Sequence, residues 1–289
     1  MHVHSNYQGV RLPVFWSSRK QAEYSIGGEN TVVHPTAEIG SNVEIGPFTY
    51  VGPNCRIGDN CKLHNNVSLL ANTVLGENNE IYPGAVVGAD PQDKKFEGED
   101  SWVLIGDGNT IRECVTIHLG TRHGGGNTVI GNRNLLMACC HVAHDCILGD
   151  GITMANNVLL GGHVVVENNA TFGGLAAVHH YATVGESAFI GGMTRISLDV
   201  PPYMLVEGSP VKVWSINKVG LRRHGFSPEG MESLKEAHRC LYREGYSRVE
   251  AVKLLKDRLW DCPEVQNLVN FLDRADQGHK GRARQPSSE

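Results

Sequence analysis

An aliphatic side chain recurs at every sixth position through most of the first two hundred residues, and this period constrains the fold more than any other feature. The first series is Val33, Ile39, Ile45, Val51, Ile57, Leu63, Leu69, Leu75, Ile81 and Val87, followed by Ile105, Ile111 and Ile117. A second series, shifted by one residue, is Ile130, Leu136, Val142, Leu148, Met154, Leu160, Val166, Phe172, Val178, Val184, Ile190 and Ile196. A period of six fits neither an α-helix nor simple strand alternation. It predicts a solenoid whose short parallel strands stack coil on coil.

The repeat divides the chain into four parts. Residues 1–30 show no period and are expected to be an extension, residues 31–200 the solenoid, residues 201–275 a helical domain, and residues 276–289 a disordered tail. Ser227 and Pro228 predict a helix N-terminus, Val249 to Leu259 suggest a second helix, and Pro263 opens a third. If three hexads form one coil, residues 18 apart (three times six) become neighbours in space.

Two interruptions of the repeat are expected to be loops. The segment DPQDKKFEGEDSW, from residue 90 to residue 102, is too polar for a core strand. The segment TRHGGGN, from residue 121 to residue 127, falls where the two series lose their common phase. Loops that leave a rigid scaffold often carry function.

Composition and charge exclude several classes of protein. The net charge of −5 gives no support to a role in binding nucleic acid. No apolar stretch approaches the roughly 20 residues needed to span a bilayer, and the N-terminus lacks the apolar core of a signal peptide. Four of the eight cysteines occupy a slot of the repeat that takes small buried side chains: Cys55, Cys61, Cys140 and Cys146. Structural thiols in a reducing compartment, the cytoplasm, are therefore expected.

Several of the 14 histidines fall where coils should stack. His144, Gly162 and His180 are 18 residues apart, and His163 and His179 flank that column. Stacked strands lie about 4.8 Å apart, so several imidazoles should share one column. An imidazole is well suited to take a proton from a hydroxyl at neutral pH, and His144, which precedes Asp145, is the strongest candidate of this column.

The run CCHVAHDC (139–146) also suggests a metal site. Zinc requires three or four converging ligands. Cys140 and Cys146 are expected to point inward, whereas His141 and His144 occupy other phases of the hexad. These residues should not converge, and we expect no bound metal.

Longer segments of the chain resemble the UDP-N-acetylglucosamine O-acyltransferases that open lipid A synthesis. The resemblance covers roughly residues 31–274 and is carried by VHPTA (33–37), PQDKKFEGE (91–99), GNRNLLMACCHVAHDC (131–146), LGGHV (160–164), AVHH (177–180), DVPPYMLVEGSP (199–210) and NKVGLRRHGFS (217–227). It implies a left-handed parallel β-helix of hexapeptide repeats with a C-terminal α-helical domain, assembled as a homotrimer with active sites between subunits. It also implies transfer of a 3-hydroxyacyl group from acyl carrier protein to the 3-hydroxyl of UDP-N-acetylglucosamine, without a cofactor.

The resemblance assigns three catalytic roles. His144 would be the general base, Asp93 in the polar loop would orient its imidazole, and the backbone N–H of Gly162 would meet the developing oxyanion. Eight further positions would bind substrate or line its groove: Lys95, His141, His163, His179, His180, Gly192, Asn217 and Arg223. Among these, Asn217 and Arg223 would hold the sugar nucleotide, and Gly192 would leave room for a long acyl chain.

The sequence departs from the family pattern at four positions. His180 replaces a Gln, Leu119 replaces an Arg, and Val219 and His224 replace polar or basic residues. These changes leave open whether the acceptor carries a 3-hydroxyl or a 3-amine. Alternatives are an acetyl-CoA-dependent or N-acyl-transferring hexapeptide enzyme, a zinc hydratase built on histidines such as His118 and His141, and a scaffold without catalysis.

Overall fold

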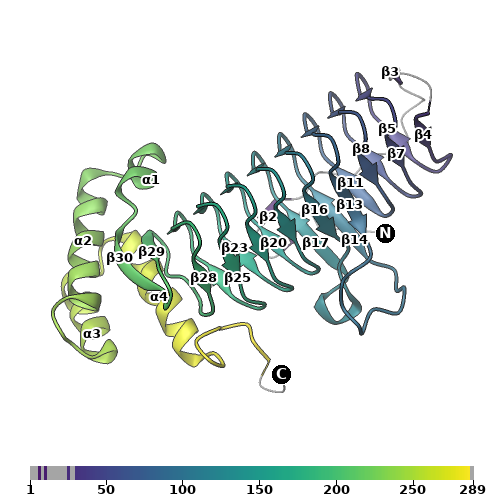
Figure 1. The fold of residues 1–289 in the computed structure, drawn as a ribbon. Coiled ribbons are helices and arrows are strands. Elements are labelled where there is room, and N and C mark those ends of the chain that lie inside the picture. The colour runs from purple at the N-terminus through teal and green to yellow at the C-terminus, as the bar shows by residue number, and fades with distance from the viewer. Residues whose placement is uncertain (1–5, 8–9, 12–24, 27–29, 287–289) are drawn as a thin grey trace.

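The computed structural model describes residues 6–7, 10–11, 25–26 and 30–286 of the chain. In this part of the molecule, a long solenoid of stacked coils ends in a small helical domain (Figure 1). Each coil contributes strands to three sheets in turn, which we call sheets I, II and III and which are parallel except for the last strand of sheet III.

The strand bounds follow the six-residue period. Sheet I contains β4 (Val32–Val33), β7 (Tyr50–Val51), β10 (Ser68–Leu69), β13 (Val86–Ala89), β16 (Thr116–His118), β19 (His141–Val142), β22 (Leu159–Leu160), β25 (Ala177–Val178) and β28 (Arg195–Ile196). Sheet II contains β5 (Glu38–Ile39), β8 (Arg56–Ile57), β11 (Thr73–Leu75), β14 (Trp102–Ile105), β17 (Asn127–Ile130), β20 (Ile147–Leu148), β23 (Val165–Val166) and β26 (Thr183–Val184). Sheet III contains β3 (Ser25–Ile26), β6 (Glu44–Ile45), β9 (Lys62–Leu63), β12 (Glu80–Ile81), β15 (Thr110–Ile111), β18 (Leu135–Leu136), β21 (Thr153–Met154), β24 (Thr171–Phe172), β27 (Phe189–Ile190), β29 (Met204–Glu207) and β30 (Lys212–Ile216). A separate antiparallel pair consists of β1 (Asn6–Tyr7) and β2 (Val10–Arg11).

The aliphatic series forms the core, and the predicted solenoid fold is confirmed. Ile57, Leu63, Ile117 and Phe172 are no more than 2 % exposed. Parallel strands pair in the expected register, so that His141 lies opposite Leu159, 18 residues later (159 minus 141). Each coil therefore buries its aliphatic side chains against the next.

Left-handed backbone conformations make the corners between sheets. Asn54, Asn60 and Asn66 have φ values of 56° to 59°. Asn adopts this region more readily than most residues because its short polar side chain bonds locally. Below, "the I/II corner" means the turns that lead from sheet I to sheet II, and "the III/I corner" those that lead from sheet III to sheet I.

Both predicted loops leave the I/II corner. Residues 90–101 connect β13 to β14, and residues 119–126, which include the 3₁₀ helix η1 (Arg122–Gly124), connect β16 to β17. The backbone N–H of Arg122 donates to Glu99 Oε1 at 3.0 Å, so the two loops contact each other.

The helical region agrees with the sequence at three helices and differs before them. Helices α2 (Pro228–Tyr242), α3 (Arg248–Arg258) and α4 (Pro263–Gln277) match the three predicted helices, and the Ser227 side chain caps α2. The strands do not end after residue 200 as expected, because β29 pairs with β27 and then with β30 in a hairpin. A short helix, α1 (Lys218–Arg223), follows and was not predicted.

Both expected end segments also need correction. β3 pairs with β6, so the solenoid begins before residue 31; most of the expected extension lies outside the described residues. The tail is ordered through residue 286 rather than disordered. Arg282 is 5 % exposed and donates to the Ser197 carbonyl, and the Ala283 N–H donates to Asp199 Oδ2 at 2.8 Å. The polar composition of residues 276–289 predicted disorder and gave no sign of these hydrogen bonds to the last coil.

The cysteines behave as small core side chains. Cys55, Cys61, Cys140 and Cys146 are fully buried, and all eight cysteines are free thiols. Burial raises the pKa of the Cys55 thiol to about 11 and that of Cys146 to about 12. None of the helices in the described ranges combines the length and the apolar character that crossing a bilayer requires.

Candidate active site

The I/II corner brings the predicted histidine column together. The His163 N–H donates to the His144 carbonyl at 3.0 Å, and the Tyr181 N–H donates to the Gly162 carbonyl at 3.1 Å. Residues 144, 162 and 180 therefore occupy successive coils, as the spacing predicts.

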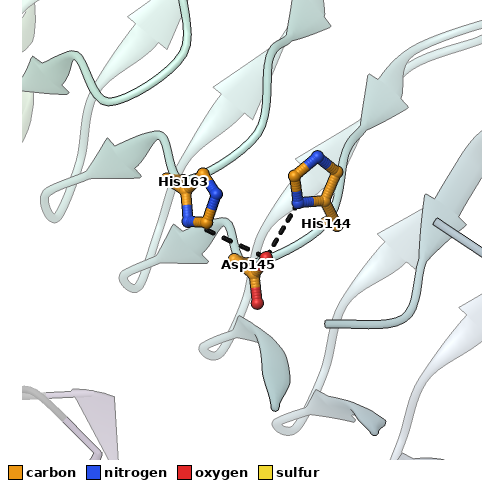
Figure 2. A group of neighbouring side chains, drawn as sticks. All are labelled: His144, Asp145 and His163. Atoms are coloured by element: carbon orange, nitrogen blue, oxygen red, sulfur yellow. Dashed lines mark hydrogen bonds and ion pairs between the residues drawn. The ribbon is translucent and has the colours of Figure 1, made fainter. Parts of the chain in front are cut away.

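The centre of this corner is a hydrogen bond between adjacent residues. His144 Nδ1 lies 2.8 Å from Asp145 Oδ2 (Figure 2). Asp145 is 2 % exposed and has a left-handed φ of 61°. An ionised carboxylate only accepts hydrogen bonds, so Nδ1 carries the proton and Nε2, which points away from Asp145, is free to accept one.

This bond corrects the predicted role of Asp93. The carboxylate that orients His144 within the chain belongs to Asp145. Asp93 instead accepts from the N–H of Lys95 at 3.0 Å, inside its own loop. The left-handed turn allows Asp145 to reach back to the imidazole beside it, which the hexad pattern alone does not reveal.

Gly162 provides the space that His144 occupies. A Cβ atom on Gly162 would lie 2.5 Å from His144 Cε1 and 2.6 Å from Nε2. Among the bonds of residues 30–286, none uses the Gly162 N–H as donor, although its carbonyl accepts from Tyr181. A free N–H therefore lies in the peptide over which the imidazole packs.

His163 extends the site into the next coil. Its Nδ1 lies 3.7 Å from Asp145 Oδ2, and its ring meets that of His144 edge-on with centroids 5.1 Å apart (Figure 2). The ring of Tyr181 stacks on the other side of His163 at 4.4 Å. His163 is thereby held between the base and an aromatic ring.

Two further histidines, His118 buried and His141 half-buried, form a pair beside the site. His118 and His141 meet edge-on at 4.9 Å, and His141 Nδ1 lies 2.7 Å from Thr116 Oγ1. Burial lowers the pKa of His118 to about 4 and also lowers the pKa of His141, with neighbouring imidazoles adding to both effects. His118 Nδ1 is buried and has no hydrogen-bond partner within the described residues.

The remaining predicted residues lie in different parts of the fold. His179 and His180 belong to the I/II corner, with ring centroids 3.8 Å apart. Lys95 is exposed in the polar loop. Gly192 is exposed at the III/I corner, between β27 and β28.

Asn217 and Arg223 lie at the two ends of α1. Arg223 is exposed, whereas Asn217 is 5 % exposed. The Asn217 amide accepts from Gly220 and donates to the Ser187 carbonyl, so within the chain it caps α1. A single chain does not place Gly192, Asn217 or Arg223 at the I/II corner.

The site also contains a possible metal-ligand group. One atom each of His144, Asp145 and His163 lies within 4.8 Å of the others. The Asp145 carboxylate already accepts from His144 Nδ1, the Thr121 N–H at 2.7 Å and the Thr121 hydroxyl at 2.6 Å. An ion at about 2 Å from each ligand would have to replace several of these bonds. The donors present suit a hydrogen-bonded carboxylate better than a metal centre.

Sequence reasoning missed Thr121 and Gly124. Thr121 is 1 % exposed and begins the glycine-rich loop, and a Cβ atom on Gly124 would lie 1.9 Å from Asp145 Cγ. The available signal was the break in the repeat at this loop, because an insertion at the I/II corner must return beside the corner of the next coil.

Comparison with known proteins yields consistent similarities. The family described as UDP-N-acetylglucosamine O-acyltransferase, domain 2, matches residues 199–280. The bacterial transferase hexapeptide family matches residues 36–69, 54–89 and 127–162.

Whole-length relatives carry one name, acyl-[acyl-carrier-protein]–UDP-N-acetylglucosamine O-acyltransferase. The protein from Halorhodospira halophila is 47% identical over 249 residues, which cover 86% of this chain and 96% of the relative. The protein from Trichlorobacter lovleyi is 48% identical over 252 residues, which cover 86% of this chain and 97% of the relative.

Solved structures give the same result. A UDP-N-acetylglucosamine acyltransferase from Bacteroides fragilis superposes with a TM-score of 0.83 and 41% identity, covering 85% of this chain and 96% of that one. The Arabidopsis enzyme of the same description has a TM-score of 0.78 and 35% identity, and the match covers 89% of this chain and 98% of that one.

Proposed function

The chain belongs to the acyl-[acyl-carrier-protein]–UDP-N-acetylglucosamine O-acyltransferase family, and on that premise we propose how its own residues perform the transfer. It is an acyltransferase that acts on acyl carrier protein and UDP-N-acetylglucosamine in the first step of lipid A biosynthesis. The donor is a 3-hydroxyacyl thioester, and the acceptor is the sugar 3-hydroxyl.

His144 is the general base. The bond from Nδ1 to Asp145 leaves Nε2 as the acceptor, and this is the observation that carries the proposal. Nε2 takes the proton of the sugar hydroxyl as its oxygen attacks the thioester carbonyl. Asp145 keeps the imidazole in this tautomer and stabilises the imidazolium that forms.

The tetrahedral intermediate then collapses beside Gly162. Its oxyanion accepts from the Gly162 N–H, which no described group occupies. The carbon–sulfur bond breaks, the carrier protein leaves as a thiolate, and the imidazolium returns the proton to the sulfur. Ester and thiol are the products, and His144 is neutral again.

The other predicted residues bind the substrates. Arg223 and Asn217 hold the sugar nucleotide, Arg223 through its phosphates, and Lys95, His141, His163, His179 and His180 line the groove. Gly192 leaves room for a long acyl chain.

A homotrimer unites these residues. Gly192 lies at the III/I corner and His144 at the I/II corner, so one protomer must offer its I/II corner to the III/I corner of a neighbour. Large apolar side chains are exposed on sheet I and at the III/I corner between those positions: Phe48, Tyr50, Leu159, Leu175 and Met193, the last 76 % exposed. Burial of such a surface favours association.

The free thiols favour a reducing compartment, and we place the enzyme in the cytoplasm.

Replacing His144 by Ala tests the base. We expect turnover with 3-hydroxyacyl carrier protein and UDP-N-acetylglucosamine to fall by about 10² to 10⁴. His34→Ala, on the first coil, is the matched control and should keep wild-type turnover. Retained activity in the His144 variant would remove the mechanism. Acetyl-CoA and a 3-amino sugar nucleotide, assayed in parallel, test the two alternative reactions.

Mixing two inactive variants tests the shared site. If His144 and Arg223 of neighbouring protomers form one site, mixed trimers of His144→Ala and Arg223→Ala contain sites with both wild-type residues. Co-refolded mixtures should then recover activity that neither variant has alone. No recovery, with an affinity tag on one variant shown to co-purify the other, would contradict the shared site.

A further inference from the structure

We propose that Thr121 is a positioning residue that holds the Asp145 carboxylate, and through it the His144 imidazole, in the reactive arrangement. The inference rests on the proposed function, because it concerns the same base. Thr121 does not contact the imidazole, so its effect must pass through Asp145.

Thr121 supplies hydrogen bonds to both oxygens of the carboxylate. Its backbone N–H donates to Asp145 Oδ1 at 2.7 Å, and its hydroxyl donates to Oδ2 at 2.6 Å. Oδ2 is also the atom that accepts from His144 Nδ1 at 2.8 Å. Two donors at fixed positions prevent the carboxylate from rotating away from the imidazole.

The direction of the Thr121 hydroxyl bond is fixed by a third group. The N–H of Gly124 donates to Thr121 Oγ1 at 3.2 Å, as expected of the residue that caps η1. Toward Gly124 the Thr121 oxygen acts as the acceptor, and an ionised carboxylate can only accept. The one hydrogen of the Thr121 hydroxyl therefore goes to Asp145.

The surroundings keep this arrangement rigid. Thr121 is 1 % exposed, and Gly124 packs directly on the carboxylate of Asp145. The next N–H of the loop, that of Arg122, donates to Glu99 in the polar loop. The glycine-rich loop therefore contacts the carboxylate directly, and the polar loop contacts the residue next to Thr121.

Losing the hydroxyl would have two effects on His144. The carboxylate would gain freedom to rotate, which lowers turnover. Oδ2 would also lose one of two donors and concentrate more negative charge on its remaining bond, which stabilises the imidazolium. Among the described residues, His144 and His163 lie closest to the Asp145 carboxylate, the buried Cys146 thiol is its neighbour, and His118 and His141 lie near His144. The change in charge acts first on the imidazoles of His144 and His163.

The test compares Thr121→Val with Thr121→Ser. For the valine variant we expect kcat to fall about 10- to 100-fold, the factor for one lost hydrogen bond to a charged group, with KM values changed less than about twofold. The acidic limb of its pH–kcat profile should move to higher pH. The serine variant keeps the hydroxyl and should restore both. Thr121→Ala takes the place of the valine variant if that protein does not fold.

Thr49→Val is the matched control, because Thr49 is also a buried threonine that donates through its hydroxyl, but to the His64 carbonyl on a distant coil. It should lower stability and leave kcat unchanged. In an Asp145→Asn background, Thr121→Val should cause no additional loss of kcat, because its effect passes through Asp145.

A wild-type kcat and pH profile for Thr121→Val would overturn the inference, as would equal additional losses in both backgrounds. His144→Ala, measured in the same series, distinguishes failure of the Thr121 inference from failure of the proposed base. If it is inactive while Thr121→Val is normal, only the role of Thr121 fails. If it is active, the proposed base fails as well.

Discussion

The imidazole of His144 packs against the backbone of Gly162 in the next coil, so closely that a methyl group on Gly162 would lie 2.5 Å from His144 Cε1. The imidazole can take this position only because residue 162 has no side chain. The base and the proposed oxyanion donor are therefore a matched pair on adjacent coils.

Gly162→Ala should displace the imidazole and reduce kcat by at least about 100-fold, since small errors in the position of reacting groups have effects of this size. Gly174→Ala is the control, because its Cβ would meet only Asn156 O at 3.3 Å. Steady-state kinetics, with thermal unfolding to verify the fold, measure the effect. Normal kcat for Gly162→Ala would mean that the imidazole works from another position.

Asp145 contacts the His144 imidazole and Asp93 does not, so their substitutions should have different effects. Asp145→Asn should lower kcat by about 10² or more, because an amide can present an N–H to Nδ1 and favour the wrong tautomer. Asp93→Asn should leave the acidic limb of the pH–kcat profile in place, since Asp93 does not contact the imidazole. A shift of that limb in the Asp93 variant would return the orienting role to the polar loop.

His118 should make stability depend on pH. Its pKa is about 4 in the folded chain against an ordinary 6.5, so between these values the unfolded state binds more protons. This contribution to the free energy of unfolding is fully present above pH 6.5 and is lost as the pH falls toward 4. Urea unfolding at several pH values should give a shallower decline for His118→Phe. If stability fell with pH as steeply in His118→Phe as in the wild type, His118 would not be buried as a neutral imidazole.

The ordered tail should contribute to stability. Arg282→Ala removes a buried guanidinium that bonds to the Ser197 carbonyl and Gln285, and should cost about 1–3 kcal/mol. Arg222→Ala, at an exposed position, should have little effect. Denaturant unfolding of both variants provides the comparison, and equal midpoints would mean that the tail is not bound in solution.

The four core thiols should resist alkylation. Their pKa values of about 11 to 12 leave almost no thiolate at pH 8, and burial excludes the reagent. Iodoacetamide followed by peptide mass spectrometry should find Cys55, Cys61, Cys140 and Cys146 unmodified in the folded protein and modified in guanidinium chloride. Rapid labelling of Cys146 in the folded state would show that its coil opens.

The sequence predicted the repetitive part of this structure better than the irregular parts. One period determined both the aliphatic core and the stacking of residues 144, 162 and 180, because strand pairing converts a constant spacing into contact. The same argument could not predict that Asp145, rather than Asp93, holds the imidazole. That contact depends on a left-handed turn within one corner and on Thr121 returning from a loop of irregular length.

The ends of the chain were harder to predict for a related reason. The β29–β30 hairpin has no six-residue repeat, and its first strand continues sheet III only because β27 leaves an open edge. The tail has a polar composition typical of disorder, yet Arg282 and Ala283 meet acceptors that the last coil leaves available.

The left-handed corners have a consequence for how this scaffold can change. Asp145, His163 and Tyr181 share φ values of 61° to 63° at successive I/II corners, the conformation that Asn54 adopts earlier in the chain. The backbone is thus the same whether the residue is structural or reactive, and the cost of a non-glycine residue there is at most about 1–2 kcal/mol, lower for Asn and Asp than for His or Tyr. New specificities can arise along this edge by exchange of single side chains, with no loop to rebuild and no strand to move.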